Sequence, residues 1–354
     1  MYIRLKTGIL LLCIFLLAGC SPRPVPATPG LPATPTSTSI PVGLTQEQFA
    51  TLSSLQKVDD YPLYTMTYSG VYQPRKAAVL FENLLPTSES LPAWACSLFT
   101  ALLDEDHLLY GRNFDWQFSP ALLLFTDPPD GYASVSMVDI EYLGFDKHTV
   151  ENITSLPIEE QMSLLDAPYL PFDGMNEYGL AIGMAAVPSG NMQPDVDKET
   201  IGSLGIIRQM LDRARTVDEA VDIIRNYNID FGGGPSIHYL MADATGKSVL
   251  VEYYNGEMYI LPNEEAWHLA TNFLRSSVDD PEDGGCWRYN KIAAQLTETD
   301  GQIDTQAAMQ LLASVAQNNT QWSVIYQMSS GSVNVAMGQQ YQDVHQFQLD
   351  LVSQ

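Results

Sequence analysis

Strand-like and helix-like patterns fall in separate blocks of this sequence, and this grouping constrains the fold more than any other feature. In the first half, short runs rich in aromatic and β-branched residues alternate with a rough period of two, which predicts strands. These runs lie at residues 61–68, 94–116, 122–125, 132–142 and 179–186. The run at 94–116 is divided by the turn cluster Asp104, Glu105 and Asp106, which indicates a hairpin.

The second half adds helices without mixing them among the strands. Apolar residues recur at helical spacing over 204–211, and Thr216–Glu219 forms a capping box before a second helical pattern. A strand meander then covers 236–261, helical patterns return near 288–296 and 305–315, and strands follow at 324–326, 333–336 and 344–351. Such grouping favours an α+β fold, with antiparallel sheets and helices outside them, over the βαβ repeat of a parallel sheet.

The first 20 residues, MYIRLKTGILLLCIFLLAGC, have the pattern of an export signal. Arg4 and Lys6 precede an apolar run at 8–17. This run is shorter than the ~20 residues of a membrane-spanning helix, so a cleaved signal, residues 1–19, is favoured over a permanent transmembrane anchor. Leu17–Cys20 resembles the box of a bacterial lipoprotein signal, in which the cysteine becomes N-terminal and lipid-modified. We therefore expect an exported protein that a lipid on Cys20 anchors to the bacterial cell membrane.

Residues 20–45 are dominated by Pro, Ser and Thr and have no apolar periodicity. Such a segment cannot form a core, and it is expected to act as an extended, semi-rigid tether. The globular part of the chain is then expected from residue 46 onward.

Charge and cysteine content limit the partners. Acidic residues number 42 against 17 basic ones, for a formal net charge of -25. Electrostatic binding of nucleic acid or of an anionic lipid surface is therefore disfavoured, and small molecules are the expected partners. The four cysteines lie at Cys13, Cys20, Cys96 and Cys286. They are too few and too scattered for a disulfide scaffold or a CxxC zinc site, and no metal or organic cofactor is indicated.

Cys96 stands at the head of a predicted strand, and the polar residues Arg112 and Asp115 follow one hairpin later. In a hairpin that turns near Glu105, these positions lie roughly opposite Cys96. A nearby cation lowers the pKa of a thiol and increases the nucleophilic thiolate. The alternative is a buried cysteine that serves as a small hydrophobic residue.

A cysteine nucleophile needs a general base, and no histidine stands in a motif that marks one. The five histidines are His107, His148, His238, His268 and His345. Three of them, His238, His268 and His345, lie in or near predicted strands, where a structural role is favoured. A nucleophile can instead use its own α-amine, provided that peptide cleavage makes it N-terminal.

Four motifs carry a resemblance to a known family. Cys96 followed by Gly111–Trp116 (GRNFDW) resembles the start of the mature chain in the choloylglycine hydrolase and penicillin V acylase family of N-terminal nucleophile hydrolases. Asp173–Leu180 (DGMNEYGL), Thr271–Asn272 and Cys286–Tyr289 (CWRY) resemble its later motifs, in the same order. The resemblance covers most of residues 96–354 and implies a four-layer αββα sandwich of two antiparallel sheets.

The resemblance also implies an autoproteolytic maturation. Cys96 would attack the Ala95 carbonyl and release a leader, which leaves a catalytic domain of residues 96–354 with a free α-amine. An amine with an ordinary pKa near 8 is suited to accept the thiol proton near neutral pH. Asp115 would orient the amine and thiol, and Arg112 would favour the thiolate.

The remaining roles implied by the family concern the transition state. Asn272 through its side-chain amide and Asn176 through its backbone N–H would face the oxyanion of the tetrahedral intermediate. Arg288 would complete the polar network around Cys96 or position the substrate. Each residue has a structural alternative: Asn176 as a turn cap before Gly179, and Arg288 as a surface residue of its helix.

Further alternatives concern residues around the nucleophile. Asp115 could pair only with Arg112, as a structural ion pair. Trp94 and Trp116 could form walls for the acyl group or pack in the core, and Cys286 is expected to be a packed thiol. The acyl pocket is expected to be shaped by loops such as 118–130 and 187–197.

The leader of this chain, residues 20–95, is long compared with many relatives, and its globular part is the pro-segment 46–95. The Tyr61–Tyr68 strand is expected to stay packed on the catalytic domain as a non-covalent subunit, so that the lipid anchor still holds the enzyme.

Three functions follow. The first is an exported amidase that hydrolyses linear, non-peptide C–N bonds of small N-acyl amides through an acyl-thioester. The second is an acyltransferase with an amine acceptor, and the third is a non-catalytic ligand-binding lipoprotein. Bile salts, penicillin V, N-acyl homoserine lactones and other N-acyl amines all remain candidate ligands, and the oligomeric state is left open.

Overall fold

The computed structural model describes residues 40–72 and 95–352, except residues 189 and 233. The predicted signal, Cys20, most of the tether and Trp94 therefore lie outside the described residues. Residues from 40 onward belong to one compact unit. Within the described ranges, no helix combines the length and the apolar character needed to cross a membrane.

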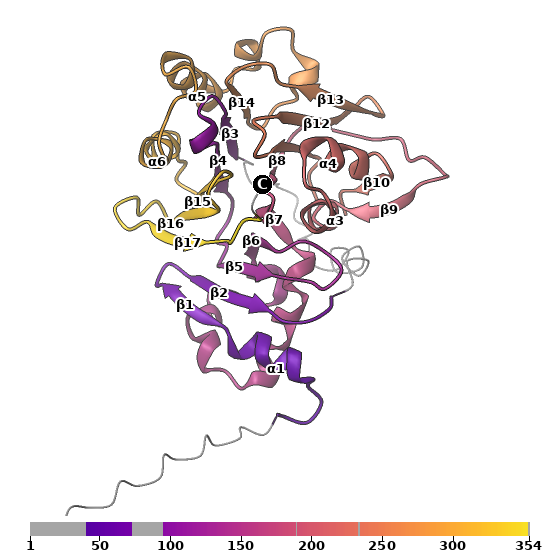
Figure 1. Cartoon of the computed structure of the whole chain (residues 1–354), viewed down its shortest axis with the longest axis vertical. Helices are drawn as coiled ribbons and strands as arrows, with labels where there is room; N and C mark the ends of the chain where they lie inside the picture. Colours follow the sequence, from indigo (N-terminus) through magenta and orange to yellow (C-terminus); the bar gives the residue numbers. More distant parts are fainter. Residues whose placement is uncertain (1–39, 73–94, 189, 233, 353–354) are drawn as a thin grey trace, which may run out of the picture. The chain divides into compact units, whose positions relative to one another are not determined.

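A nine-stranded sheet, here called sheet A, forms one half of the molecule (Figure 1). Its strand order is β1-β2-β5-β6-β7-β8-β11-β12-β13. All neighbours are antiparallel except β2 and β5, which run parallel. The strands are β1 (Gln56–Asp59), β2 (Leu63–Tyr68), β5 (Ala121–Thr126), β6 (Ser134–Asp139), β7 (Pro171–Asn176), β8 (Ala181–Ala186), β11 (Ile237–Ala242), β12 (Ser248–Tyr254) and β13 (Glu257–Pro262).

A six-stranded antiparallel sheet, sheet B, packs on sheet A. Its order is β14-β3-β4-β15-β16-β17. The strands are β14 (Trp267–Ala270), β3 (Ser97–Ala101), β4 (Leu109–Asp115), β15 (Thr320–Gln327), β16 (Ser332–Met337) and β17 (His345–Gln348). Residues of both sheets, such as Leu98, Trp322 and Leu240, are fully buried in one apolar core. The predicted period-two runs thus correspond to strands that bury one face between the sheets.

Helices cover the outer faces of both sheets. On sheet A, α3 (Gly205–Arg213) packs on β7 and β8, with α4 (Val217–Ile224) beside it. On sheet B, α5 (Trp287–Glu298) and α6 (Thr305–Ser314) enclose a second apolar core. Half of the predicted capping box is present at α4: the Thr216 side chain accepts a hydrogen bond from the Glu219 N–H, but the Glu219 carboxylate accepts from the Arg215 N–H in place of the Thr216 N–H. The predicted α+β fold and αββα sandwich are therefore confirmed.

Several elements were not predicted from the sequence. They are α1 (Gln46–Ser53), β1, β7, β14, the small parallel pair β9 (Glu199–Gly202) and β10 (Tyr227–Asp230), and the 3₁₀ segments η2 (Glu105–His107), η3 (Ile140–Leu143), η4 (Val150–Ser155), η5 (Ile158–Tyr169), η6 (Arg275–Ser277) and η7 (Pro281–Gly284). The sequence of β7, PFDGMN, lacks an apolar alternation because its Asp173 and Asn176 are buried and bonded to other elements. Polar residues with such partners conceal the strand from pattern reading.

The described part of the leader is built into sheet A. Strand β2 lies parallel to β5 over six paired positions, from Leu63 beside Ala121 to Tyr68 beside Thr126. Helix α1 packs on β2, and β1 completes the edge of the sheet. The three leucines of β5, at 122–124, are fully buried, so β2 covers an edge that would otherwise be long and apolar.

Candidate active site

Cys96 and Asp115 are brought together by the predicted hairpin. Strands β3 and β4 pair with Ser97 opposite Asn113 and Leu98 opposite Arg112, and η2 lies in the turn between them. Cys96 directly precedes β3, and Asp115 ends β4. The Cys96 side chain is buried, with 5% exposure. The hairpin therefore places a cysteine at the edge of the inter-sheet core, beside the polar end of β4.

The ionisation of the Cys96 thiol is governed by its burial and by the neighbouring charges of Arg112 and Asp115. Burial raises the pKa of the thiol above its ordinary value, and this is the largest effect. The positive charge of Arg112 opposes this effect, whereas the Asp115 carboxylate adds to it. The thiol therefore needs a base, in addition to the Arg112 charge, to become nucleophilic near neutral pH.

Arg112 is fixed by a fully buried ion pair with Asp173. Its Nη1 also donates to the Phe172 carbonyl at 2.7 Å, and its guanidinium lies 4.9 Å from the centre of the Phe114 ring. The partner of Arg112 is thus Asp173 and not Asp115, which removes the alternative of an Arg112–Asp115 pair. The role of Asp173 was not predicted, although it opens the motif DGMNEYGL.

Asp173 is itself held from sheet B. The Tyr326 hydroxyl donates to its Oδ1 at 2.5 Å, and the indole N–H of Trp322 lies 3.4 Å from its Oδ2. These two donors come from β15, so the cation beside Cys96 is positioned by contacts between the sheets.

The Asp115 side chain is buried, and only one of its two carboxylate oxygens has a hydrogen-bond partner among the described residues. Its Oδ1 accepts a hydrogen bond from the Thr320 hydroxyl at 2.5 Å, whereas Oδ2 has no hydrogen-bond partner in the described part of the chain. Burial raises the pKa of Asp115 to about 7, against the opposing effects of the Thr320 hydrogen bond and the charges of Arg288 and Arg112. This carboxylate therefore changes its charge within the physiological pH range.

The backbone nitrogen of Cys96 is bound by Asn272 and the Cys96 carbonyl by Arg288. The Cys96 N–H donates to Asn272 Oδ1 at 2.6 Å, and Arg288 Nη2 donates to the same oxygen at 2.9 Å. Arg288 Nη1 donates to the Cys96 carbonyl and, at 2.9 Å, to Ser97 Oγ. Arg288 is 6% exposed, so the alternative of a surface residue does not hold. Asn272 Nδ2 donates to the Ala186 carbonyl at 2.7 Å.

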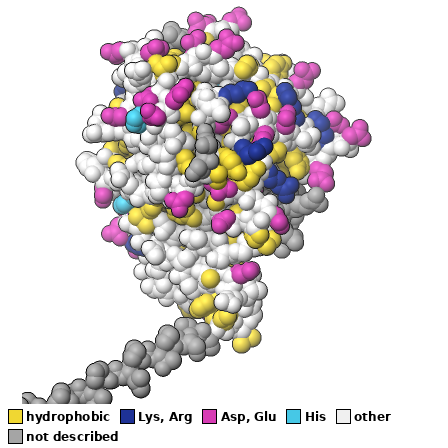
Figure 2. Space-filling model, in the orientation of Figure 1, with side chains coloured by type: hydrophobic (Ala, Val, Ile, Leu, Met, Phe, Trp, Pro, Cys, Tyr) yellow, Lys and Arg dark blue, Asp and Glu magenta, His cyan; other side chains and the backbone are white. Residues whose placement is uncertain are grey.

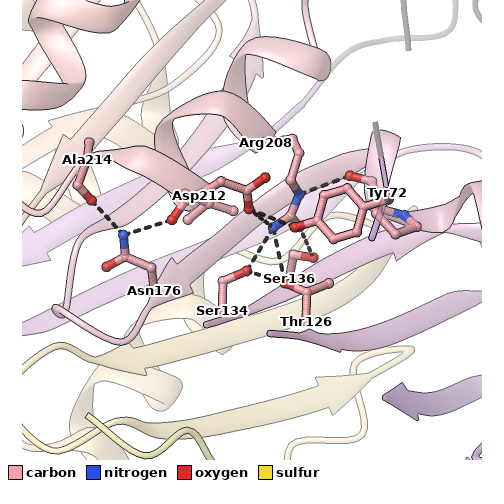
Figure 3. Close-up of polar contacts among 10 residues, drawn as sticks. Tyr72, Thr126, Ser134, Ser136, Asn176, Arg208, Asp212 and Ala214 are labelled. Carbon is pink, nitrogen blue, oxygen red and sulfur yellow. Dashed lines mark hydrogen bonds and ion pairs between the residues drawn. The ribbon is translucent and has the colours of Figure 1, made fainter. Parts of the chain in front are cut away.

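Asn176 is not part of this group. Its backbone N–H donates to the Leu180 carbonyl at 3.0 Å, and its Oδ1 accepts from the Leu180 N–H at 3.2 Å. Its Nδ2 donates to the carbonyls of Leu211 and Ala214, at 3.0 and 2.7 Å, as Figure 3 shows. The expectation that its N–H faces the oxyanion is therefore corrected. Asn176 caps the turn between β7 and β8, in which Gly179 has a φ of 75°, and ties this turn to the end of α3.

A second buried network lies near Asn176 and was not predicted (Figure 3). Arg208 of α3 donates to Asp212 Oδ1 at 3.0 Å and to the hydroxyls of Ser134 and Ser136 of β6 at 2.8 and 3.0 Å. The leader residue Tyr72 also donates to Asp212 Oδ1, at 2.8 Å. This network connects the leader with α3 and sheet A, whereas Cys96 precedes β3 of sheet B.

An apolar cavity opens on the Cys96 thiol. Its described lining is Cys96, Arg112, Phe114, Asp115, Trp116, Tyr142, Phe172, Met184, Ala186, Ser203, Leu204, Phe231, Gly234, Pro235 and Ile237. The polar groups gather at the Cys96 end, and the other walls are mainly aromatic and aliphatic. Trp116 is a wall, in line with one of its two expected roles. None of the described residues in the expected loops, 118–130 and 187–197, lines the cavity; strand residues and the segments at 203–204, 231 and 234–237 contribute to its wall instead.

Among the described residues that line the cavity there is no histidine, and the buried His238 and the half-buried His268 have other partners. His238 Nδ1 lies 2.9 Å from Glu252 Oε1, and His268 Nδ1 lies 2.9 Å from the Ser248 hydroxyl. Burial lowers the pKa of His268 to about 4. Cys286 is a free thiol that packs against the second core.

Acidic side chains are spread over the face seen in Figure 2. One described group, Asp59, Asp343 and His345, could offer three ligand atoms to a metal. It joins β17 to the end of β1 and does not border the cavity.

Comparison with known proteins gives one family and a set of related folds. The profile of the linear amide C–N hydrolases, choloylglycine hydrolase family, matches residues 96–272, which is half of the chain. A mutant of the conjugated bile acid hydrolase from Clostridium perfringens has 16% sequence identity and a TM-score of 0.53, covering 72% of this chain and 92% of that one. A second variant of that enzyme has 15% identity and a TM-score of 0.50, with the same coverage.

The structure of penicillin V acylase from Agrobacterium tumefaciens has 16% identity and a TM-score of 0.49, covering 72% of this chain and 87% of that one. At these identities, the likeness to the bile acid hydrolase structures establishes the αββα fold.

Proposed function

This chain belongs to the choloylglycine hydrolase family of linear amide C–N hydrolases, and on that premise we propose that it hydrolyses small N-acyl amides through an acyl-thioester on Cys96. One observation carries the proposal. The Cys96 nitrogen is held by Asn272 at 2.6 Å, while its thiol faces Arg112 at the polar end of an apolar cavity. Nucleophile, base and acyl site would thus meet at one residue.

Maturation creates the base. The Cys96 sulfur attacks the Ala95 carbonyl, the Ala95–Cys96 C–N bond breaks, and the nitrogen takes up a proton as the leader moves onto sulfur as a thioester. Water then hydrolyses the thioester and leaves a carboxylate on Ala95 and a free α-amine on Cys96. Asn272 Oδ1, which already accepts from this nitrogen, would hold the amine in place.

Turnover repeats the same chemistry on a substrate. The α-amine takes the thiol proton, the thiolate attacks the amide carbonyl, and the amine returns the proton to the leaving nitrogen. Water resolves the acyl-thioester to the free acid. The second hydrogen of Asn272 Nδ2 is the side-chain donor we assign to the oxyanion, since Ala186 accepts the first. Arg112 and Arg288 supply the positive field around the nucleophile.

The cavity supports an apolar acyl group. Its walls away from Cys96 are formed by aromatic and aliphatic side chains, including Trp116, Tyr142 and Phe172. Conjugated bile acids and penicillin V, named in the relatives, are therefore included as trial substrates, together with N-acyl homoserine lactones and simple N-acyl amines.

We further propose that the enzyme is exported, carries a lipid on Cys20 and keeps its leader after cleavage. The pairing of β2 with β5 and the burial of Tyr64, whose hydroxyl donates to the Val150 carbonyl, support retention. The lipid would then anchor both pieces to the bacterial membrane.

Intact mass spectrometry of wild type and Cys96→Ala tests the proposal. A wild-type fragment that begins at Cys96, absent from the variant, is the expected result. An uncut wild-type chain that binds but does not hydrolyse the trial substrates would instead favour the ligand-binding lipoprotein. Addition of amine acceptors during turnover separates hydrolysis from acyl transfer.

A further inference from the structure

We propose that the leader residue Tyr61 is a positioning residue of the active site, which acts through Gln321 on the end of β4. The inference rests on the function proposed for Cys96, and it makes the leader a working part of the enzyme as well as its tether. A series of hydrogen bonds carries the inference from the leader to the residues that line the cavity with Cys96.

Tyr61 lies in the turn between β1 and β2, and residues of the chain after Cys96 surround it. Its N–H donates to Asp59 Oδ1 at 2.8 Å, and Asp59 Oδ2 lies 2.6 Å from Nε2 of His345 on β17. The Tyr61 ring occupies the space beside Gly338, where any Cβ would overlap the ring; Gly338 also has a φ of 52°. The leader turn is therefore fixed in position by residues far along the chain.

The Tyr61 hydroxyl reaches Gln321, which is 4% exposed. Gln321 falls at the irregularity where the pairing of β15 with β4 shifts between Thr320 and Trp322. Its Oε1 accepts from the Tyr61 hydroxyl at 2.9 Å and from the Ser119 N–H at 3.1 Å. Burial raises the pKa of Tyr61, so the hydroxyl stays protonated and remains a donor.

The other end of the Gln321 amide holds the chain beside the nucleophile. Its Nε2 donates to the Trp116 carbonyl at 3.0 Å and to the Asn319 carbonyl at 2.8 Å. Both acceptor positions and both donor hydrogens of the amide are then in use, which fixes its orientation. The Asn319 carbonyl also accepts from the Trp116 N–H at 3.0 Å.

This cluster stands next to the groups that act on Cys96. Trp116 is a cavity wall, and the preceding residue, Asp115, lines the same cavity as the Cys96 side chain. The hydroxyl of Thr320, the neighbour of Gln321, donates a hydrogen bond to the Asp115 carboxylate. Loss of the Tyr61 hydroxyl would leave one acceptor site of a buried amide empty and loosen Trp116 and Asp115 together.

The test compares Tyr61→Phe with Tyr64→Phe in the full chain. Each variant removes one hydroxyl with which the leader bonds the rest of the chain, but only Tyr61 contacts Gln321. The first readout is the rate at which iodoacetamide alkylates Cys96 between pH 6 and 9, with Cys286 as an internal reference. The second readout is kcat/KM on an N-acyl amide.

We expect Tyr61→Phe to slow Cys96 alkylation by up to about fivefold near neutral pH, the effect of one net hydrogen bond. The Cys286 rate should not change, and Tyr64→Phe should leave both cysteines at the wild-type rate. A Gly338→Ala variant, which displaces the ring from the opposite side, should lower the Cys96 rate at least as much.

Equal Cys96 rates in Tyr61→Phe and wild type would overturn the inference, as would equal losses in Tyr61→Phe and Tyr64→Phe. Because alkylation needs no substrate turnover, these outcomes are distinguishable from failure of the proposed amidase activity. That failure would appear as a wild-type protein with a reactive Cys96 but no hydrolysis.

Discussion

The backbone nitrogen of Cys96 donates a hydrogen bond of 2.6 Å to the side-chain oxygen of Asn272, a residue 176 positions further along the chain. This contact joins the head of β3 to the residues after β14, two strands that pair in sheet B. It determines where an α-amine would stand after cleavage. The Asn272 amide thus has two separate contacts, its oxygen with the Cys96 nitrogen and its nitrogen with the Ala186 carbonyl, and the proposed mechanism assigns its second N–H to the oxyanion.

Substitution of Asn272 should separate these two functions. Asn272→Asp keeps an oxygen for the Cys96 nitrogen but lacks the amide donor, so turnover should slow by about 10²–10³-fold. Asn272→Ala loses both groups and should also slow formation of the fragment that begins at Cys96. Single-turnover kinetics and intact mass measure the two effects. Similar maturation rates in both variants would show that the oxygen does not hold the nitrogen.

Thr320 should set the acid limb of the pH profile. The Thr320 hydroxyl accepts a hydrogen bond from the Gln317 N–H at 2.8 Å and donates its own hydrogen bond to the Asp115 carboxylate. Thr320→Val removes that donor and should raise the pKa of Asp115 further. The acid limb of kcat/KM should then move upward by about one to two pH units, as expected for a hydrogen bond to a charged group. Thr320→Ser keeps the hydroxyl and should restore the wild-type profile.

The ionised Asp115 carboxylate should lower the free energy of unfolding at alkaline pH. Its pKa in the folded protein, about 7, lies above the ordinary 3.8, so the folded state binds more protons than the unfolded state between these values. The stability contributed by the protonated form is present below about pH 4 and is lost as pH rises through about 7. In a Cys96→Ala background, Asp115→Asn should be more stable than its parent by about 2–4 kcal/mol at pH 8 and nearly equal at pH 4. Urea unfolding at both pH values measures this difference; a constant difference would contradict the assignment.

The Arg112–Asp173 pair should be critical for folding. Both side chains are fully buried, so Asp173→Leu would leave an uncompensated guanidinium in the core. The expected loss is about 3–5 kcal/mol in the free energy of unfolding. The double variant Arg112→Met with Asp173→Leu should regain much of that stability while remaining inactive. If the double variant is no more stable than Asp173→Leu, the loss does not come from the unpaired charge.

Asn176→Ala should destabilise the protein without stopping its chemistry. The Asn176 side chain bonds Leu180, Leu211 and Ala214, and it does not line the cavity. A loss of about 1–3 kcal/mol is expected, with the fragment that begins at Cys96 still formed and turnover near the wild-type rate. If turnover instead slowed by about a hundredfold while the stability was unchanged, the result would show that Asn176 contributes to the oxyanion site.

Local patterns predicted the parts of the site that lie on one hairpin. Cys96, Arg112 and Asp115 are close in sequence, and the turn at residues 104–106 makes them neighbours in space. Asn272 and Arg288 were expected here only through the family resemblance, because nothing in their local sequence indicates which strand they face. Asp173, Thr320 and Gln321 were missed for the same reason. Each is an ordinary polar residue whose partner comes from another element.

In the leader, too, the local sequence predicted an element but not its partner. The run at residues 61–68 predicted a strand, because aromatic and β-branched residues alternate there. Its parallel pairing with β5 had no local signal, because alternation indicates which face of a strand is buried but does not identify the neighbouring strand.

The sequence by itself determined the grouped strands and helices, and with them the layered α+β architecture, because hydrophobic period is a local property of the chain. It also supplied the hairpin that carries Cys96 and Asp115. Only the tertiary structure decided that Asp173 neutralises Arg112, that Asn176 caps a turn, and that the Tyr61 hydroxyl bonds Gln321. Buried polar groups must find partners, and the packing of the two sheets decides which partner each one meets.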